Sequence, residues 1–482
     1  MPTPPTHDKS LLRVGSVLLA SALLLAAAAA CNTEQDPFAS PEARDHTAAM
    51  SAHHLCSGVF VVGRDYQRSA EQVFAEDIGP FSAFNWQDDF EYEVNMDAKT
   101  ASVWAHDVSR RTAKYNGDQG CTILISGETD VHYVPVPVPR NLPDPGTQAW
   151  PTGDVGAYGA FPEVNQASLD SAFEWAMGQG QNTRALVVAY KGRVIGERYA
   201  LGFTKNTPQI SWSQGKSITA ALIGVLVQQG HFTVDDPAPV PEWHGADDPR
   251  NEIKIKHLLR MSSGLDFLNL GLGQPNSWTD ENEHFLIYFD APNVFEHAID
   301  QPMDIPPDSM FRYRNSDPLT LGRVVRQTVE ATGEDYLTFP QRALFDRIGA
   351  RDYVLETDPY GNFIMTGYDF GSAWSWLRFG LLHSWDGVWE GERILPEGWV
   401  EFISTPAPGD PDLGYGGLFW LNRGRAMDQI PEDAFWAAGF MGQTTMVIPS
   451  RDVVIVRLGP SPGRYNQYLN EVVGRVLSAI EQ

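Results

Sequence analysis

Residues 210–220 read ISWSQGKSITA, a sequence with the features of a helix start. Ser211 and Gln214 have the spacing of a capping box, in which the serine side chain caps the helix and the glutamine side chain caps the serine backbone. The apolar run 220–227 continues the pattern, and Gly230 can end it because glycine adopts the left-handed conformation common after a helix. We therefore predict a buried helix with Ser211 as its N-cap.

Ser213 and Lys216 fall on the same face of this predicted helix, since residues three apart are neighbours on a helix surface. A serine hydroxyl is a weak nucleophile until a neighbouring base takes its proton. A lysine can be that base when burial and the positive end of the helix dipole destabilise its ammonium form. The pair therefore predicts a serine nucleophile that attacks a carbonyl carbon, although an S-x-x-K tetrad can also arise by chance.

The composition excludes one class of partner. The chain has 482 residues, with 61 acidic and 35 basic side chains and a formal net charge of −26. A nucleic-acid-binding protein needs a basic surface to neutralise phosphates, so we expect no nucleic-acid partner. The His and Cys spacings do not match a zinc site, and we expect neither a metal nor an organic cofactor.

The N-terminus is typical of an exported bacterial protein. An uncharged apolar stretch, residues 14–30, follows two basic side chains and ends directly before Cys31. A cysteine after small residues resembles the cleavage box of bacterial lipoproteins, although Ala28 stands where those boxes more often carry Leu. We expect residues 1–31 to be an export signal and the protein to be periplasmic or anchored to the cell envelope by a lipid on Cys31. An ordinary signal peptide and an uncleaved anchor are the alternatives.

The remaining cysteines fit an oxidising compartment. If Cys31 is lipidated, Cys56 and Cys121 are left as an even pair. We predict a disulfide between Cys56 and Cys121, with two buried free thiols as the alternative.

Composition divides the rest of the chain into four parts. Residues 32–54 are small and polar and are expected to be a tether. Residues 55–130, which open with the apolar run GVFVV, predict a small, mainly β domain. The proline-rich stretch 131–160 predicts an extended linker. The main domain, 161–482, has strand patterns at both ends and a helical insertion at about 231–375, which predicts an α+β fold with one antiparallel sheet flanked by helices.

Two further motifs lie in this main domain. Tyr313 and Asn315 precede an Asp-Pro pair at 317–318, so they are expected on a loop that leads into a helix. A tyrosine there can carry a proton if nearby cations lower its pKa, and packing against the insertion is the alternative. Gly439, on a predicted strand, permits the close backbone approach that an oxyanion-binding N–H needs, with an ordinary bulge as the alternative.

The order of these motifs resembles a known family. The tetrad 213–216, the triplet 313–315 and the strand with Gly439 resemble the serine β-lactamase and penicillin-binding-protein superfamily, as does the sequence HLLRMSSGL at 257–265. The nearest branch holds the class C β-lactamases, the esterases of that fold and the 6-aminohexanoate-dimer hydrolases. The resemblance covers roughly 165–482 and implies a β-lactamase/transpeptidase-like fold for this part of the chain.

The resemblance also implies a mechanism. Ser213 would be the acylated nucleophile, Lys216 its base, and Tyr313 the proton shuttle to the leaving group. Asn315 would hydrogen-bond Lys216 or the substrate. Backbone N–H groups of Ser213 and Phe440 would form the oxyanion hole. The resemblance thus implies a serine hydrolase that acts on a small molecule without a cofactor, and we expect it to be monomeric.

One departure from the family pattern bears on the substrate. Ala437 and Ala438 precede Gly439 where β-lactamases and D,D-peptidases of the superfamily carry Lys or His and then Thr or Ser. That lysine helps to hold the substrate carboxylate, and no basic residue lies between Trp436 and Ser450. We therefore expect a carboxylic ester or a small amide as substrate. The alternatives are a penicillin-binding D,D-carboxypeptidase or β-lactamase, and a catalytically inactive lipid-tethered binding protein on the same fold.

A second serine motif is rejected. The sequence GPSPG at 459–463 matches the G-x-S-x-G elbow of α/β-hydrolases. That fold needs an acid and then a histidine further along the chain, and no His follows His383 and no Asp follows Asp452. Proline on both sides of Ser461 favours a turn.

Overall fold

A computed structural model describes the fold of the protein. The described residues are 41–63, 68–79, 89–268, 283–463 and 465–480. The predicted export signal and the lipidation candidate Cys31 lie outside these ranges. Within them, no helix combines the length and the apolar character that a membrane span requires.

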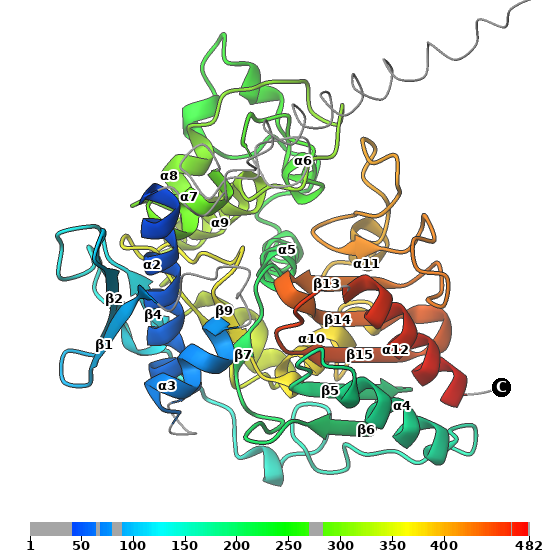
Figure 1. The fold of residues 1–482 in the computed structure, drawn as a ribbon. Coiled ribbons are helices and arrows are strands. Elements are labelled where there is room, and N and C mark those ends of the chain that lie inside the picture. The colour runs from blue at the N-terminus through cyan, green and yellow to red at the C-terminus, as the bar shows by residue number, and fades with distance from the viewer. Residues whose placement is uncertain (1–40, 64–67, 80–88, 269–282, 464, 481–482) are drawn as a thin grey trace, which may run out of the picture.

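A six-stranded antiparallel sheet forms the centre of the main domain, in the strand order β12-β13-β14-β15-β5-β6 (Figure 1). Its strands are β5 (Ala185–Tyr190), β6 (Arg193–Tyr199), β12 (Trp420–Leu421), β13 (Phe435–Gly439), β14 (Gln443–Ile448) and β15 (Val453–Leu458). The pairing of β15 with β5 joins strands from the two ends of the domain. The predicted single sheet, assembled from both ends and flanked by helices, is therefore confirmed.

Both faces of this sheet are buried, because alternate side chains of each strand enter different cores. Val188 and Ile455 belong to one core, and their neighbours Val187 and Val456 belong to the other. The covering helices are α4 (Gln166–Gly178) and α12 (Tyr465–Ala479) on the first face, and α5 (Gln214–Gln228) and α10 (Ala373–Ser384) on the second. A hairpin of β10 (Val388–Trp389) and β11 (Glu392–Arg393), then α11 (Trp399–Ile403), lead from α10 back to the sheet.

Helix α5 runs through the interior of the molecule, and its residues 214–226 are all buried. It ends at the predicted glycine, because Gly230 has a φ angle of 82°. The N–H of His231 then donates to the carbonyl of Leu226 at 3.1 Å, a helix-ending arrangement that favours glycine at position 230.

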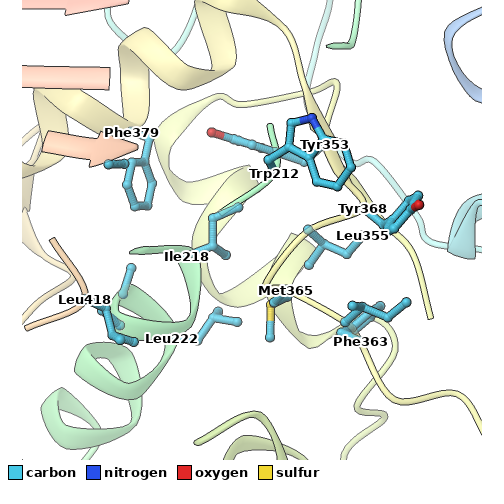
Figure 2. Packing of buried hydrophobic residues seen from close by; sticks show 14 of the residues in the cluster. Trp212, Ile218, Leu222, Tyr353, Leu355, Phe363, Met365, Tyr368, Phe379 and Leu418 are labelled. Atoms are coloured by element: carbon cyan, nitrogen blue, oxygen red, sulfur yellow. The ribbon is translucent and has the colours of Figure 1, made fainter. Parts of the chain in front are cut away.

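The insertion between α5 and α10 packs against α5. Its described helices are α6 (Ile255–Leu259), α7 (Glu283–Phe289), α8 (Val294–Ile299) and α9 (Ser316–Ala331). A small sheet of order β7-β9-β8 joins β7 (Gln209–Ile210) to β9 (Asp369–Gly371) and β8 (Val354–Leu355). Figure 2 shows Ile218 and Leu222 of α5 beside Met365 of the segment between β8 and β9. This packing places that segment next to the start of α5.

The N-terminal residues form a unit in which a helix covers a four-stranded sheet (Figure 1). The helices are α2 (Pro41–Cys56) and α3 (Ala70–Val73). The strands are β1 (Glu91–Asn95), β2 (Thr100–Ala105), β3 (Val108–Tyr115) and β4 (Cys121–Ile123), which pair in chain order.

Two expectations for this unit are wrong. Residues 41–54, expected to lie in a polar tether, form most of α2, and its alanines, among them Ala48 and Ala52, allow close packing on the sheet. The apolar run at 58–62, expected as a strand, lies within a π-helix over Ser57–Val62. An apolar run this short has no periodicity that separates a strand from a buried helix.

The N-terminal unit contacts the main domain through a buried acid. Glu356 and His53 are both fully buried, with 2.8 Å between Oε2 and Nε2. The same carboxylate accepts hydrogen bonds from Ser57 Oγ and from the N–H of Cys121, each at 2.8 Å. A disulfide joins Cys56 to Cys121, so it links α2 to β4 beside this acid.

We expect the double variant Cys56→Ser, Cys121→Ser to be less stable than the wild type by about 4 kcal/mol, since the disulfide removes conformational entropy from the unfolded chain. The two cysteines are 65 residues apart in sequence. Urea unfolding measures the difference. A reducing agent should lower the midpoint of the wild type and leave that of the double variant unchanged. Equal midpoints for the double variant and the oxidised wild type would contradict the expectation.

Candidate active site

The N-cap of helix α5 lies two residues after the position that the sequence predicted for it. Ser213, not Ser211, is the N-cap residue, and no side chain caps the helix there. The predicted role of Ser211 is wrong because its hydroxyl accepts a hydrogen bond from Trp376 Nε1 at 2.9 Å, inside the core. The Ser213 hydroxyl is therefore not used as a cap.

Ser213 and Lys216 form a hydrogen-bonded pair at this helix start. Lys216 Nζ donates to Ser213 Oγ at 2.9 Å and to the carbonyl oxygen of Thr366 at 3.1 Å. The lysine side chain is buried, and burial lowers its pKa to about 7, against an opposing effect of the Asp369 charge. A large fraction of the amine is therefore neutral near pH 7, as a general base requires.

The carbonyl of Thr366 is a shared acceptor in this site. Besides Lys216 Nζ, it accepts Ser213 Oγ at 3.2 Å and the hydroxyl of Tyr288 at 2.7 Å. Sequence reasoning identified neither Thr366 nor Tyr288. A backbone carbonyl leaves no sequence signal, and Tyr288 reaches the site only because α7 folds against it.

Asn315 does not contact Lys216 directly in this structure. Its Nδ2 donates to Tyr288 OH at 3.2 Å and pairs with His284 Nδ1 at 2.9 Å. The hydrogen bonds that Lys216 makes in the described part of the chain go to Ser213 and Thr366. In this structure Asn315 is connected to Lys216 through Tyr288 and the Thr366 carbonyl rather than by direct contact, and its predicted hydrogen bond to the substrate stays a prediction.

Tyr313 lies on the loop before α9, with the centre of its ring 5.0 Å from Lys216 Nζ. Burial raises the pKa of Tyr313, and hydrogen bonding with Ser213 opposes the rise only in part. The lowered pKa that the sequence analysis set as a condition for a proton shuttle is therefore not found, because desolvation of the phenolate is the largest effect on the pKa. Tyr313 thus faces the nucleophile as a neutral phenol, packed against the rings of Tyr415 and Trp420.

Strand β13 ends beside the segment that leads into Ser213. A Cβ atom at Gly439 would lie 2.0 Å from the carbonyl oxygen of Ser211, so only glycine fits here. The next residue, Phe440, is 58% exposed, and its ring centre lies 5.7 Å from that of Trp212. The two predicted oxyanion donors, the N–H groups of Ser213 and Phe440, thus belong to two segments that the fold brings into contact.

Strand β13 beside Ser213 carries apolar rather than basic side chains, and aromatic rings pack around Tyr313. Ala437 is buried in β13, and the strand carries no basic side chain. Phe311 stacks on Tyr415 with 4.8 Å between ring centres. No cluster of His, Cys, Asp and Glu that could hold a metal occurs in the described ranges.

A family model, a curated protein and solved structures are each similar to a large part of this chain. Residues 169–475 match the family model described as Beta-lactamase. The 6-aminohexanoate-dimer hydrolase of Paenarthrobacter ureafaciens is 23% identical over 340 residues, which span 66% of this chain and 81% of that protein. The structure of EstCE1, described as a hydrolase with promiscuous acyltransferase activity, is similar with a TM-score of 0.52 and 18% identity, over 64% of this chain and 99% of that one. A penicillin-binding protein homologue from Caulobacter crescentus gives a TM-score of 0.50 and 13% identity, over 67% and 99%.

We expect Gly439→Ala to destabilise the protein by about 1–3 kcal/mol, because the added methyl group forces two backbone segments apart. It should also lower reactivity at Ser213, since the displaced carbonyl lies two residues before that serine. Gly178→Ala is the matched control, because a Cβ atom there has no neighbour within 4 Å. Urea unfolding of both variants is the measurement. A Gly439→Ala protein as stable and reactive as Gly178→Ala would refute the close approach.

Proposed function

Because the chain belongs to the β-lactamase family of serine hydrolases, we propose that it cleaves a carboxylic ester or a small amide through an acyl-enzyme on Ser213. One observation carries the proposal: the 2.9 Å hydrogen bond between Ser213 Oγ and a buried amine, that of Lys216, whose pKa is about 7. A lysine with an ordinary pKa would be protonated at neutral pH and could not accept the serine proton.

The proposed reaction begins with transfer of the Ser213 hydroxyl proton to Lys216 Nζ as Oγ attacks the substrate carbonyl carbon. The negative charge that develops on the carbonyl oxygen is stabilised by the N–H groups of Ser213 and Phe440. The lysine proton then passes through the Tyr313 hydroxyl to the leaving alcohol or amine as its bond to the carbonyl carbon breaks. A water molecule attacks the acyl-enzyme in the second half, and its proton returns by the same route to Ser213 Oγ.

The lining of the site supports a substrate without a required carboxylate. The alanine pair before Gly439 supplies no cation to hold one, and the aromatic cluster of Tyr313, Tyr415 and Trp420 favours an apolar group. The names of two similar proteins, a 6-aminohexanoate-dimer hydrolase and a hydrolase with acyltransferase activity, support the same reaction class.

Export of the protein is part of the same proposal. Disulfides persist in oxidising compartments, and Cys56 is bonded to Cys121. This bond supports an exported protein, with Cys31 as the site of a lipid anchor.

Intact mass after labelling tests the proposed nucleophile. We expect one fluorophosphonate adduct on the wild-type protein, none on Ser213→Ala, and none on either protein after incubation with penicillin. A penicillin adduct lost in Ser213→Ala would instead indicate a penicillin-binding D,D-carboxypeptidase or β-lactamase. A wild-type protein that forms neither adduct would refute the acyl-enzyme and favour a binding protein.

The pH dependence of labelling tests the proposed base. Lys216 must be neutral to accept a proton, so the rate should be level above about pH 7 and fall about tenfold per pH unit below it. Lys216→Arg keeps a cation that cannot lose its proton, and should lower the rate by about 10²–10⁴-fold. Lys191→Arg, at a partly exposed lysine paired with Glu163, is the control and should leave the rate unchanged. A rate independent of pH between 5 and 8, or an active Lys216→Arg variant, would count against this role.

A further inference from the structure

A buried arginine lies behind the segment that would supply the second oxyanion donor. Arg457 on β15 is fully buried, and its Nη1 donates to the carbonyl oxygens of Met441 at 3.3 Å, of Gly442 at 3.1 Å, and of Gly459. In the described part of the chain its hydrogen-bond acceptors are carbonyl and hydroxyl oxygens, and no carboxylate pairs with it. Burying a cation without an acidic partner has a large desolvation cost, which charge-assisted hydrogen bonds to the surrounding oxygens offset. These hydrogen bonds hold the carbonyl groups that accept them firmly in place.

The other side of the same guanidinium is fixed to the central sheet. Arg457 Nη2 donates to the carbonyl of Gln181 and, at 3.1 Å, to Thr183 Oγ1, and Nε donates to that hydroxyl at 3.2 Å. Gln181 and Thr183 directly precede β5. Arg457 therefore ties the turn Phe440–Gly442 to the start of the central hairpin.

Ser461 of the rejected G-x-S-x-G motif makes hydrogen bonds to the same turn and to the same residue before β5. The N–H of Ser461 donates to the Met441 carbonyl at 2.8 Å, and Ser461 Oγ donates to the Gln181 carbonyl at 3.1 Å. Gln443 Nε2 donates to the carbonyl of Phe440 at 3.3 Å and to that of Gly459 at 2.9 Å. All three carbonyls of the turn Phe440–Gly442 are thus held by Arg457, Gln443 or Ser461.

The turn needs such support because of its backbone. Met441 has a φ of 57° and Gly442 a φ of 91°, so two consecutive residues are left-handed. A Cβ atom at Gly442 would lie 2.9 Å from Arg457 Nη1, so the arginine is packed directly against this backbone.

We propose that Arg457 is a positioning residue for the reaction, which fixes the turn Phe440–Gly442 so that its backbone N–H groups are preorganised for the oxyanion. The inference rests on the proposed function, because it assigns the turn a part in that site. Arg457 acts through the Met441 and Gly442 carbonyls and does not itself meet the substrate. Oxyanion stabilisation is exerted in the transition state, so loss of Arg457 should lower kcat and leave KM nearly unchanged.

The test compares two buried arginines in the full-length protein. Arg457→Lys and Arg457→Gln are assayed with p-nitrophenyl acetate for kcat, KM and pH dependence. Arg378→Gln is the control for loss of a buried arginine, because Arg378 is also buried and also holds backbone carbonyls, those of Pro151 and Gly153, although unlike Arg457 it pairs with a carboxylate, that of Asp154. We expect kcat to fall about 10–100-fold in Arg457→Gln and less in Arg457→Lys. The upper end of this range equals the smallest effect expected when an oxyanion donor is removed altogether, about 100-fold.

A purely structural role for Arg457 predicts a different outcome. It would lower the melting temperature of Arg457→Gln and Arg378→Gln alike, with equal and small changes in kcat of the folded fraction. Preorganisation predicts a selective fall in kcat, a KM within about threefold of wild type, and an acidic limb that stays near the pH set by Lys216. If neither Arg457 variant folds, Gln443→Met releases the Phe440 carbonyl from the other side and should lower kcat in the same selective way.

The outcomes separate this inference from the proposed function. A wild type that neither hydrolyses the ester nor takes up a fluorophosphonate would overturn both. A reactive wild type whose folded Arg457 variants, or Gln443→Met in their place, keep kcat within twofold of wild type would overturn the positioning role alone.

Discussion

The burial of one amine constrains the rest of the site. Lys216 lies on a helix whose first thirteen residues are buried, and in the described structure its amine has two hydrogen-bond acceptors, Ser213 Oγ and the Thr366 carbonyl. An ammonium ion would lack the solvation it needs there, so the neutral amine is favoured. A neutral amine has a lone pair to offer, and the Ser213 hydroxyl is the proton source within reach. Burial thus gives Lys216 the neutral amine that the proposed base requires.

The segment that carries the Thr366 carbonyl also packs against the N-terminal unit, which precedes the residues that match the family. Thr366 lies between Glu356, which carries the buried contacts of that unit, and Tyr368, whose ring stacks on His53 with 3.8 Å between ring centres. The N–H of Glu356 also donates to the carbonyl of Tyr368 at 3.1 Å. The disulfide-linked unit therefore packs on both ends of the segment that presents Thr366. We infer that it supports the site rather than forming a separate module.

Part of this arrangement follows from sequence, and part could not. The Ser213 and Lys216 spacing and the strand patterns depend on local periodicity, so they predicted the helix face and the sheet. The cap at Ser211 and the pKa of Tyr313 both depend on what else is buried nearby. The cap prediction was wrong for that reason, and the lowered pKa set as a condition for Tyr313 is not found. The helix Pro41–Cys56 was missed because its alanines look like tether composition until a sheet is placed against them. Thr366 acts through a backbone atom that every residue has.

The glycine inside the S-x-x-K tetrad has a role of its own. A Cβ atom at Gly215 would lie 2.3 Å from Asp369 Oδ1, so a glycine there gives the carboxyl room against the start of α5. Burial raises the pKa of Asp369 to about 8, while that of Lys216 falls to about 7. At pH 7 the acid is then mostly protonated and about half of the amine is neutral, and with both groups neutral the site avoids the desolvation cost of a buried ion pair. In the proposed reaction, charge separates when the serine proton moves to Lys216 and the oxyanion forms beside Gly439. On this proposal, burial lowers the pKa of Lys216 so that it can act as a base. The backbone N–H groups of Ser213 and Phe440 would then be fixed in place before negative charge develops on the substrate in the transition state.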